Sequence, residues 1–312
     1  MRRMFDVRGL VKSYGPVRAV DGVSFAVARG ELFGLLGPNG AGKTTIMSML
    51  SGLLPPDEGR ILFDGIDLAS KPLAVKAALG IVPQDPALYE TLTARENLNF
   101  WGGLYGLSGS ALRSSVDRVL ELIGLADRAR DPVKTYSGGM KRRLNLALGL
   151  VHAPRAVLMD EPTVGIDPQG RLNVLDAVRR VAASGTTVIY TTHYLDEAET
   201  LCDRIAIMDH GKILAEGTLE ELKRRVGGRD VITVRGAPDL SPLLPRIDAM
   251  PGVTVASAEA GKLVVAVDGS GRGAVELLSA VLSSGLAIDG ISIQPPSLST
   301  LFLNLTGREL RD

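Results

Sequence analysis

A loop rich in glycine, residues 37–45, is the feature that most restricts what this chain can fold into. It fits the pattern G-x-x-x-x-G-K-[ST], after a short apolar run (32–36) and before a helix-like stretch (43–53). Glycines let several backbone N–H groups point into one concavity, and the following helix N-terminus adds unpaired donors and a partial positive charge. Such a loop predicts a site for the phosphates of a nucleoside triphosphate. The residues expected to form it are Gly37, Pro38, Asn39, Gly40, Ala41, Gly42, Lys43, Thr44 and Thr45.

Two side chains of this loop have separate expected roles. Lys43 supplies a full positive charge to the β and γ phosphates. The Thr44 hydroxyl suits Mg²⁺, which prefers hard oxygen ligands. The spacing of the glycines does not match the dinucleotide pattern G-x-G-x-x-G, so a nicotinamide or flavin dinucleotide is not expected here.

Short continuous apolar runs alternate with helical patterns along the first two thirds of the chain. Such runs are typical of buried parallel strands, and their alternation with helices indicates an α/β fold, here a P-loop NTPase core. The runs lie at 32–36, 81–82, 156–159, 187–190 and 205–208. We expect two additions to the core: an antiparallel β subdomain that begins with a hairpin over 5–27, and a helical insert at about 86–152.

The chain changes character after a linker-like segment at 224–229. The order beyond it is strand, helix, strand, strand, helix, strand, which predicts a small ferredoxin-like α+β domain followed by a final helix. The elements are expected at 231–234, 240–250, 253–257, 263–267, 273–284, 288–293 and 297–305. The predicted domains are therefore 1–226 and 230–312, the second with a dimerisation or regulatory role.

Charge and hydropathy exclude several functions. The 35 Lys and Arg residues balance 35 Asp and Glu residues, so no excess positive field favours nucleic acid, and none is expected as a partner. The single cysteine, Cys202, excludes an internal disulfide and fits a reducing compartment. No signal peptide is recognised, and no window reaches the roughly 18 to 20 apolar residues that span a bilayer. We expect a cytoplasmic chain whose connection to a membrane runs through a partner.

Two carboxylates follow the apolar run at 156–159. Asp160 ends that predicted strand, where a carboxylate can hold Mg²⁺, usually through water. Glu161 follows directly and points elsewhere, because consecutive side chains diverge at the end of a strand. A carboxylate that is not used by the metal is the natural general base for activating water.

Two further polar residues stand at the ends of predicted strands. His193 follows the run at 187–192, at the sheet edge where ligands bind in α/β folds, and is expected to contact the γ-phosphate. Gln84 follows the strand at 80–83 and has a neutral amide that can reach Mg²⁺ or the attacking water. Since it also begins the helical insert, it can report the nucleotide state to that insert.

A second glycine-bearing loop, residues 136–140, has no obvious role inside a single nucleotide site. Ser137 and the glycines after it open a helix that runs to residue 151, so they offer another helix N-terminus to an anion. This makes sense if the loop faces a nucleotide held by another copy of the chain. We therefore expect a homodimer that holds two nucleoside triphosphates across a two-fold axis.

With these elements in this order, the chain resembles the ATP-binding subunit of an ABC transporter over residues 5–225. The resemblance implies ATP and Mg²⁺ as cofactors and identifies residues 136–140 as the signature motif and 164–167 as the D-loop. Catalytic roles are implied for Lys43, Glu161 and His193, and magnesium contacts for Thr44, Gln84 and Asp160. Nucleotide contacts are further implied for Tyr14 (stacking on adenine), Ser137, Gly139 and Asp167.

The signature motif departs from the family pattern, since Tyr136 and Met140 replace its usual leucine and glutamine. Met140 cannot donate the amide hydrogen bonds attributed to that glutamine. Similar signatures occur among exporters that resemble the daunorubicin drug-resistance and nodulation oligosaccharide types. The basic run at 141–143 is predicted to be a solvated helical face, with a nucleotide or membrane-subunit contact as the alternative.

The resulting expectation is ATP hydrolysis that drives export of a drug, lipid or oligosaccharide-like substrate through a separate membrane permease. The chain would lie on the inner face of the membrane, with the helical insert docked on that permease. An importer subunit is the main alternative within the transporter class. A soluble ABC ATPase that acts on ribosomes or DNA and a regulator that only binds ATP are less favoured, the latter because both Glu161 and His193 are present.

Overall fold

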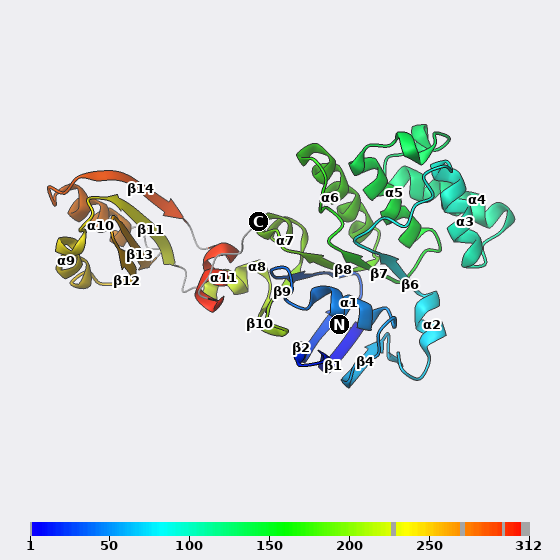
Figure 1. Cartoon of the computed structure of the whole chain (residues 1–312), viewed down its shortest axis with the longest axis horizontal. Helices are drawn as coiled ribbons and strands as arrows, with labels where there is room; N and C mark the ends of the chain where they lie inside the picture. The colour runs from blue at the N-terminus through cyan, green and yellow to red at the C-terminus, as the bar shows by residue number, and fades with distance from the viewer. Residues whose placement is uncertain (1, 226–228, 269–271, 295–296, 307–312) are drawn as a thin grey trace. The chain divides into compact units, whose positions relative to one another are not determined.

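The apolar runs form one six-stranded sheet with the strand order β10-β9-β3-β8-β7-β6 (Figure 1). It is seen in a computed structural model, which describes residues 2–225, 229–268, 272–294 and 297–306. The strands are β3 (Leu32–Leu36), β6 (Leu79–Val82), β7 (Ala156–Asp160), β8 (Thr187–Thr192), β9 (Arg204–Asp209) and β10 (Lys212–Gly217). From β9 to β6 the neighbours pair in parallel, as the sequence predicted for the core.

Both faces of this sheet are buried. On β7, Val157 and Met159 pack into one hydrophobic cluster, whereas Leu158 between them packs into another. Because side chains alternate along a strand, each face has its own cover. One face is covered by the helical insert and α6 (Pro168–Ala183), and the other by α1 (Lys43–Leu50) and an antiparallel sheet (Figure 1).

The antiparallel sheet has the strand order β2-β1-β4-β5. Its strands are β1 (Arg3–Tyr14), β2 (Val17–Ala28), β4 (Glu58–Phe63) and β5 (Ile66–Asp67), followed by the short helix α2 (Pro72–Ala77). Tyr14 pairs with Val17, so the predicted first hairpin forms with its turn at Gly15 and Pro16. This subdomain brings the start of β2 towards the phosphate-binding loop.

The insert is helical, as predicted. It contains α3 (Ala94–Leu104), α4 (Gly109–Leu122), two short 3-10 turns (Ala126–Arg128 and Val133–Thr135) and α5 (Gly138–Leu150). Helix α3 begins where it does because Thr93 and Glu96 form a reciprocal capping box. Helix α7 (Leu195–Leu201) follows β8 outside the insert.

A second unit begins at Gly217, and its sheet has the order β12-β13-β11-β14 with every pair antiparallel. Its elements are α8 (Leu219–Arg225), β11 (Arg229–Gly236), the 3-10 turn Ser241–Leu243, α9 (Leu244–Asp248), β12 (Val253–Glu259), β13 (Lys262–Asp268), α10 (Arg272–Leu282), β14 (Ile288–Gln294) and α11 (Leu298–Thr306). This is the predicted β-α-β-β-α-β order.

Two details of the second unit differ from the sequence-based expectation. The helix expected over 240–250 is split and shortened, since Pro242 and Pro245 each lack the N–H that a helix interior needs. The division between the units lies at Glu216 and Gly217, ahead of the linker predicted at 224–229, because α8 packs against α11. Among the residues that the structure describes, no helix combines the length and apolar character of a membrane span.

Candidate functional site

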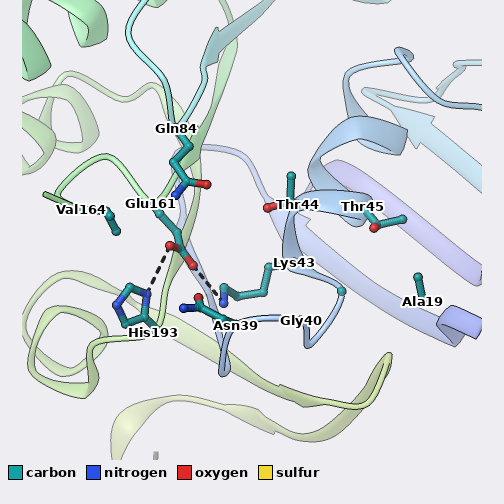
Figure 2. Close-up of a pocket in the computed structure, with 11 residues that line it drawn as sticks. Ala19, Asn39, Gly40, Lys43, Thr44, Thr45, Gln84, Glu161, Val164 and His193 are labelled. Carbon is teal, nitrogen blue, oxygen red and sulfur yellow. Dashed lines mark ion pairs between the residues drawn. The ribbon is translucent and has the colours of Figure 1, made fainter. Parts of the chain in front are cut away.

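The carboxyl ends of the central strands meet at one edge of the six-stranded sheet. Leu36 pairs with Thr192, and Asp160 pairs with Thr191. A cavity of about 560 Å³ lies at this edge (Figure 2), a size typical of small-molecule sites. It is lined by Ala19, Asn39, Gly40, Gly42, Lys43, Thr44, Thr45, Gln84, Glu161, Val164 and His193.

The loop between β3 and α1 can form only with glycine at particular positions. Gly42 precedes α1 with a φ of 102°, a left-handed conformation that favours glycine, and a Cβ there would lie 2.4 Å from the carbonyl oxygen of Ala19. A Cβ on Gly37 would lie 2.4 Å from the carbonyl oxygen of Met208. These close approaches bring the loop backbone against β2 and β9 and leave its other side facing the cavity.

Lys43 carries a buried positive charge at the base of the cavity. Its side chain is 4% exposed, and Nζ donates to the carbonyl oxygens of Gly37 at 2.6 Å and Pro38 at 3.0 Å. The same Nζ lies 3.0 Å from Oε1 of Glu161. Two of its three donors are therefore used on carbonyl oxygens of the loop, and the ion pair with Glu161 balances its charge.

Glu161 lies between Lys43 and His193 (Figure 2). Its Oε2 is 3.2 Å from Nδ1 of His193, and both side chains are less than 10% exposed. The approach of these two atoms does not have hydrogen-bond geometry, so within the described part of the chain Nδ1 has no hydrogen-bond partner. A carboxylate that lines the cavity can accept a proton from a water molecule there.

The three residues predicted to contact magnesium line a second, smaller cavity of about 300 Å³. Thr44 and Gln84 line both cavities, whereas Asp160 lines only the smaller one. The two consecutive carboxylates thus diverge as predicted. A hydroxyl, an amide oxygen and a carboxylate are hard oxygen donors, and this donor set fits Mg²⁺.

Thr191 is a residue of the site that the sequence analysis did not identify. Its Oγ1 donates to Oδ1 of Asp160 at 2.6 Å and accepts from the N–H of Glu161 at 3.0 Å. One buried hydroxyl therefore holds the carboxylate of Asp160 and the backbone of Glu161. The only signal for it is its place opposite Asp160 in the β7–β8 pairing, which the sequence alone does not give.

Seven of the predicted nucleotide contacts line neither cavity: Gly37, Pro38 and Ala41 belong to the loop itself, and the other four lie elsewhere in the chain. Tyr14 is 51% exposed at the end of β1, while Ala19 of β2 lines the larger cavity instead. Asp167 is exposed and caps α6. The remaining two, Ser137 and Gly139, open α5.

At the start of α5, Ser137 is exposed and accepts a hydrogen bond from the N–H of Met140 at 3.3 Å. Gly139 is buried, and a Cβ there would lie 2.7 Å from Cα of Gly170 on α6. This glycine therefore allows two helices to approach closely. The signature motif of this chain does not line the cavity that holds Lys43.

The basic run on α5 was predicted to be a solvated face, and that prediction is wrong. Arg142 donates through Nη1 to the carbonyl oxygen of Gln84 and through Nη2 to that of Val164, the latter at 2.6 Å. Arg143 donates to the carbonyl oxygen of Ile123 at 2.9 Å. Burial lowers the pKa of both guanidinium groups. Arg142 thus connects two loops that line the larger cavity.

Tyr136 also has a structural role. It is buried in the cluster of the insert, and its hydroxyl donates to the carbonyl oxygen of Arg128 at 2.6 Å. Burial, with a smaller effect of the Asp131 carboxylate, raises the pKa of this phenol. The ring therefore fills the place of the family's usual leucine without leaving an unpaired hydroxyl.

Comparison with known proteins identifies the family. Residues 20–164 match the ABC transporter family, and residues 217–306 match the C-terminal domain of DrrA1-3-like ATP-binding proteins. The chain is 43% identical to the linearmycin resistance ATP-binding protein LnrL of Bacillus subtilis (strain 168), over 99% of this chain and 100% of that protein. It is 41% identical to the daunorubicin resistance ATP-binding protein DrrA3 of Streptomyces coeruleorubidus, over 98% and 96% of the two chains. The Nod factor export ATP-binding protein I of Rhizobium sp. (strain N33) is 39% identical, over 98% of this chain and 97% of that protein.

Solved structures agree with this assignment. An ATP-binding subunit of an ABC transporter aligns with a TM-score of 0.64 at 32% identity, over 72% of this chain and 93% of that one. An ATP-binding cassette described as dimeric, in a post-hydrolysis state with ADP and Pi, aligns with a TM-score of 0.62 at 25% identity. The alignment covers 69% of this chain and 99% of that one. The chain is therefore an ABC-type ATPase and belongs to the family of ABC transporter ATP-binding proteins, in the drug-resistance group with a DrrA-like C-terminal domain.

Proposed function

We propose that this chain binds ATP with Mg²⁺ and hydrolyses it to drive export of a drug, lipid or oligosaccharide-like compound through a separate membrane permease. The observation that carries the proposal is the position of Glu161, 3.0 Å from Nζ of Lys43 and 3.2 Å from Nδ1 of His193 in one cavity. A general base, a phosphate-binding cation and a hydrogen-bond donor for the γ-phosphate are thereby adjacent.

Each group has a role in hydrolysis. The backbone N–H groups of the loop and Lys43 hold the phosphates. Glu161 accepts the proton of the attacking water, and His193 donates a hydrogen bond to the γ-phosphate. When bound, Mg²⁺ neutralises charge that develops on the phosphate oxygens, and Thr44, Gln84 and Asp160 are the residues that would hold it.

A dimer of two copies completes the proposed site. Ser137 and Gly139 lie at the N-terminus of α5 and outside the cavity of their own chain, so their donors are available to a nucleotide of another copy. The dimeric relative in a post-hydrolysis state supports this arrangement. Asp167 would act at the same interface, and Tyr14 would stack on adenine. The C-terminal unit would extend the dimer contact or regulate it.

The names of the similar proteins favour export over import. One of them is named for linearmycin resistance, another for daunorubicin resistance and a third for Nod factor export. We propose that the helical insert docks on the permease, which would hold the chain on the cytoplasmic face of the membrane. Co-expression with the membrane protein encoded by a neighbouring gene tests this. Co-fractionation with membranes and substrate extrusion from inside-loaded cells are expected, and uptake instead of extrusion would indicate an importer.

Substitution of the proposed base tests the enzymatic part. Glu161→Gln keeps the shape of the side chain but removes its ability to accept a proton, so ATP should still bind while hydrolysis stops. A dimer that depends on ATP should then accumulate, measured by size-exclusion chromatography with ATP and, as a control, with ADP. Turnover at the wild-type rate would remove Glu161 from the role of base.

A further inference from the structure

A buried carboxylate that hydrolysis does not directly use stands four residues after His193. Glu197 lies on α7 and is 0% exposed. Its two oxygens accept four hydrogen bonds, which fills the usual capacity of a carboxylate. The donors are Thr163 Oγ1 at 2.7 Å, Arg171 Nε at 2.7 Å, Tyr190 OH at 2.8 Å and Thr192 Oγ1 at 2.7 Å.

The groups around Glu197 hold its carboxylate in a fixed position as a hydrogen-bond acceptor. Arg171 provides the one guanidinium among the four donors, and its Nη2 also contacts the exposed carboxylate of Asp196 at 2.8 Å. Burial, and next the charge of Glu197, raise the pKa of Tyr190, so its hydroxyl keeps the proton that it donates. A buried carboxylate is tolerated when it is paired and its lone pairs are filled.

The donors belong to segments on either side of the proposed reacting groups. Thr163 comes two residues after Glu161, and Thr192 comes directly before His193. The Thr192 Oγ1 also accepts from the N–H of Tyr194 at 2.9 Å, so the residues on both sides of His193 are connected to one hydroxyl. Glu197 therefore joins the segment that carries the base to the segment that carries the histidine.

His193 is also supported through the neighbouring ring of Tyr194, which Arg171 contacts. The guanidinium of Arg171 lies 4.1 Å from the centre of the Tyr194 ring, a distance typical of a cation–π contact. The Tyr194 ring centre is 4.1 Å from that of His193. Arg171, held on Glu197, thus also supports the ring next to the histidine.

We propose that Glu197 is a positioning residue for ATP hydrolysis: it sets the separation between Glu161 and His193 and does not touch the nucleotide. This rests on the proposed function of those two residues. Its four donors all lie outside the phosphate-binding loop at 37–45. Loss of Glu197 should therefore misplace the base and the histidine while the loop still binds ATP.

The test is Glu197→Gln, which keeps the shape and one acceptor oxygen but turns the other acceptor into a donor. We expect kcat to fall roughly 10- to 100-fold, as for other residues that orient reacting groups, while the Kd for ATP changes less than about 3-fold. Asp196→Asn is the matched control, because Asp196 shares Arg171 as a partner but its side chain is 70% exposed. That variant should hydrolyse ATP at close to the wild-type rate.

Two single-donor variants keep the proposal testable if Glu197→Gln does not fold. Thr163→Val and Thr192→Val each remove one donor to Glu197. Both should lower kcat with little change in ATP affinity, and their effects should not add in the double variant if both act through Glu197. Additive effects, or equal losses of affinity and turnover, would mean that these residues support only general stability.

Other outcomes are equally clear. If Glu197→Gln has no larger effect on kcat than Asp196→Asn, the positioning role is wrong. Glu161→Gln measured in parallel separates this from the proposed function: normal turnover in that variant would overturn the function itself. If Glu161→Gln stops turnover while Glu197→Gln does not, only the positioning role is lost.

Discussion

At the scale of single residues, Glu161 has the most unusual backbone conformation in the site. Its φ of 44° lies in the left-handed region, which costs an L-residue other than glycine about 1–2 kcal/mol. The hydrogen bond from its N–H to Thr191 Oγ1, at 3.0 Å, offsets part of that cost. Since the same hydroxyl donates to Asp160, a hydroxyl from the neighbouring strand holds both the Asp160 carboxylate and the backbone of Glu161.

Thr191→Val should therefore weaken the use of magnesium in addition to lowering the stability of the fold. The substitution keeps the shape of the side chain but leaves the Glu161 N–H unpaired and removes a donor from Asp160. We expect turnover to fall about 10-fold and the Mg²⁺ concentration for half-maximal activity to rise, because the residues that orient a ligand tune metal affinity. The measurement is the hydrolysis rate as a function of Mg²⁺ concentration.

Thr187→Val is the matched control on the same strand. Its buried hydroxyl accepts from the N–H of Gly30 at 2.8 Å, at the opposite end of β8 from the site. Both variants should lose similar stability, about 1–3 kcal/mol for an unpaired buried group. An equal change in Mg²⁺ dependence in the two variants would show that the Thr191 hydroxyl has no special role in orienting Asp160.

The placement of Lys43 and Glu161 in a site could be predicted because each belongs to a local sequence pattern. Lys43 is part of a recognisable loop motif, and Glu161 follows an apolar strand. The placement of Thr191 and Glu197 could not be predicted. Thr191 reaches Asp160 from 31 residues away in the chain, only through the pairing of β7 with β8. Glu197 collects donors from three segments, and nothing near it in the sequence marks a buried carboxylate.

At the scale of elements, α5 is held unusually close to the core. A Cβ on Gly80 of β6 would lie 2.1 Å from the carbonyl oxygen of Gly149 on α5. Asn145 of the same helix donates to the carbonyl oxygen of Pro83 at 3.0 Å and accepts from the N–H of Ala87 at 3.1 Å. The helix that opens with the signature motif is therefore joined to the loop that carries Gln84. The sequence predicted the helix but not this close approach, because it depends on which helix packs on which strand.

Gly80→Ala tests the importance of this approach. The added methyl group has no space unless α5 moves away from β6, so we expect a loss of about 1–3 kcal/mol in the free energy of unfolding. Thermal unfolding followed by circular dichroism measures it. Gly103→Ala is the control, since a Cβ there meets nothing within 4 Å on the exposed side of α3 and alanine favours a helix. A midpoint for Gly80→Ala equal to that of the wild type would mean that α5 is not tightly fixed.

At the scale of the whole molecule, the two units follow from local patterns that the sequence already contained. The parallel core and the β-α-β-β-α-β unit were predictable because alternation of short apolar runs and helices is a local signal. The division at Gly217 was not, because α8 begins ahead of the linker-like segment and its place is decided by packing against α11. The proposed second copy is indicated more weakly still, by the exposure of Ser137 and its position outside the cavity of its own chain.

Mixing two defective variants tests whether two copies share their sites. Lys43→Ala removes the phosphate-binding charge, and Ser137→Arg places a bulky cation at the N-terminus of α5, where it opposes the helix dipole and blocks this terminus from a nucleotide of another copy. Each variant alone should be almost inactive. In a heterodimer, however, the intact loop of the Ser137→Arg chain faces the intact signature of the Lys43→Ala chain.

Activity should therefore return on mixing. Random pairing at equal amounts makes about half of the dimers heterodimers, each with one of two sites intact, so about a quarter of wild-type hydrolysis is expected if the sites act independently. Lys43→Ala mixed with a chain that carries both substitutions is the control, because no pair of intact half-sites forms. If the first mixture stays as inactive as the control while Ser137→Arg still binds ATP, the signature motif does not act across the dimer. Loss of ATP binding by monomeric Ser137→Arg would instead place Ser137 in the site of its own chain.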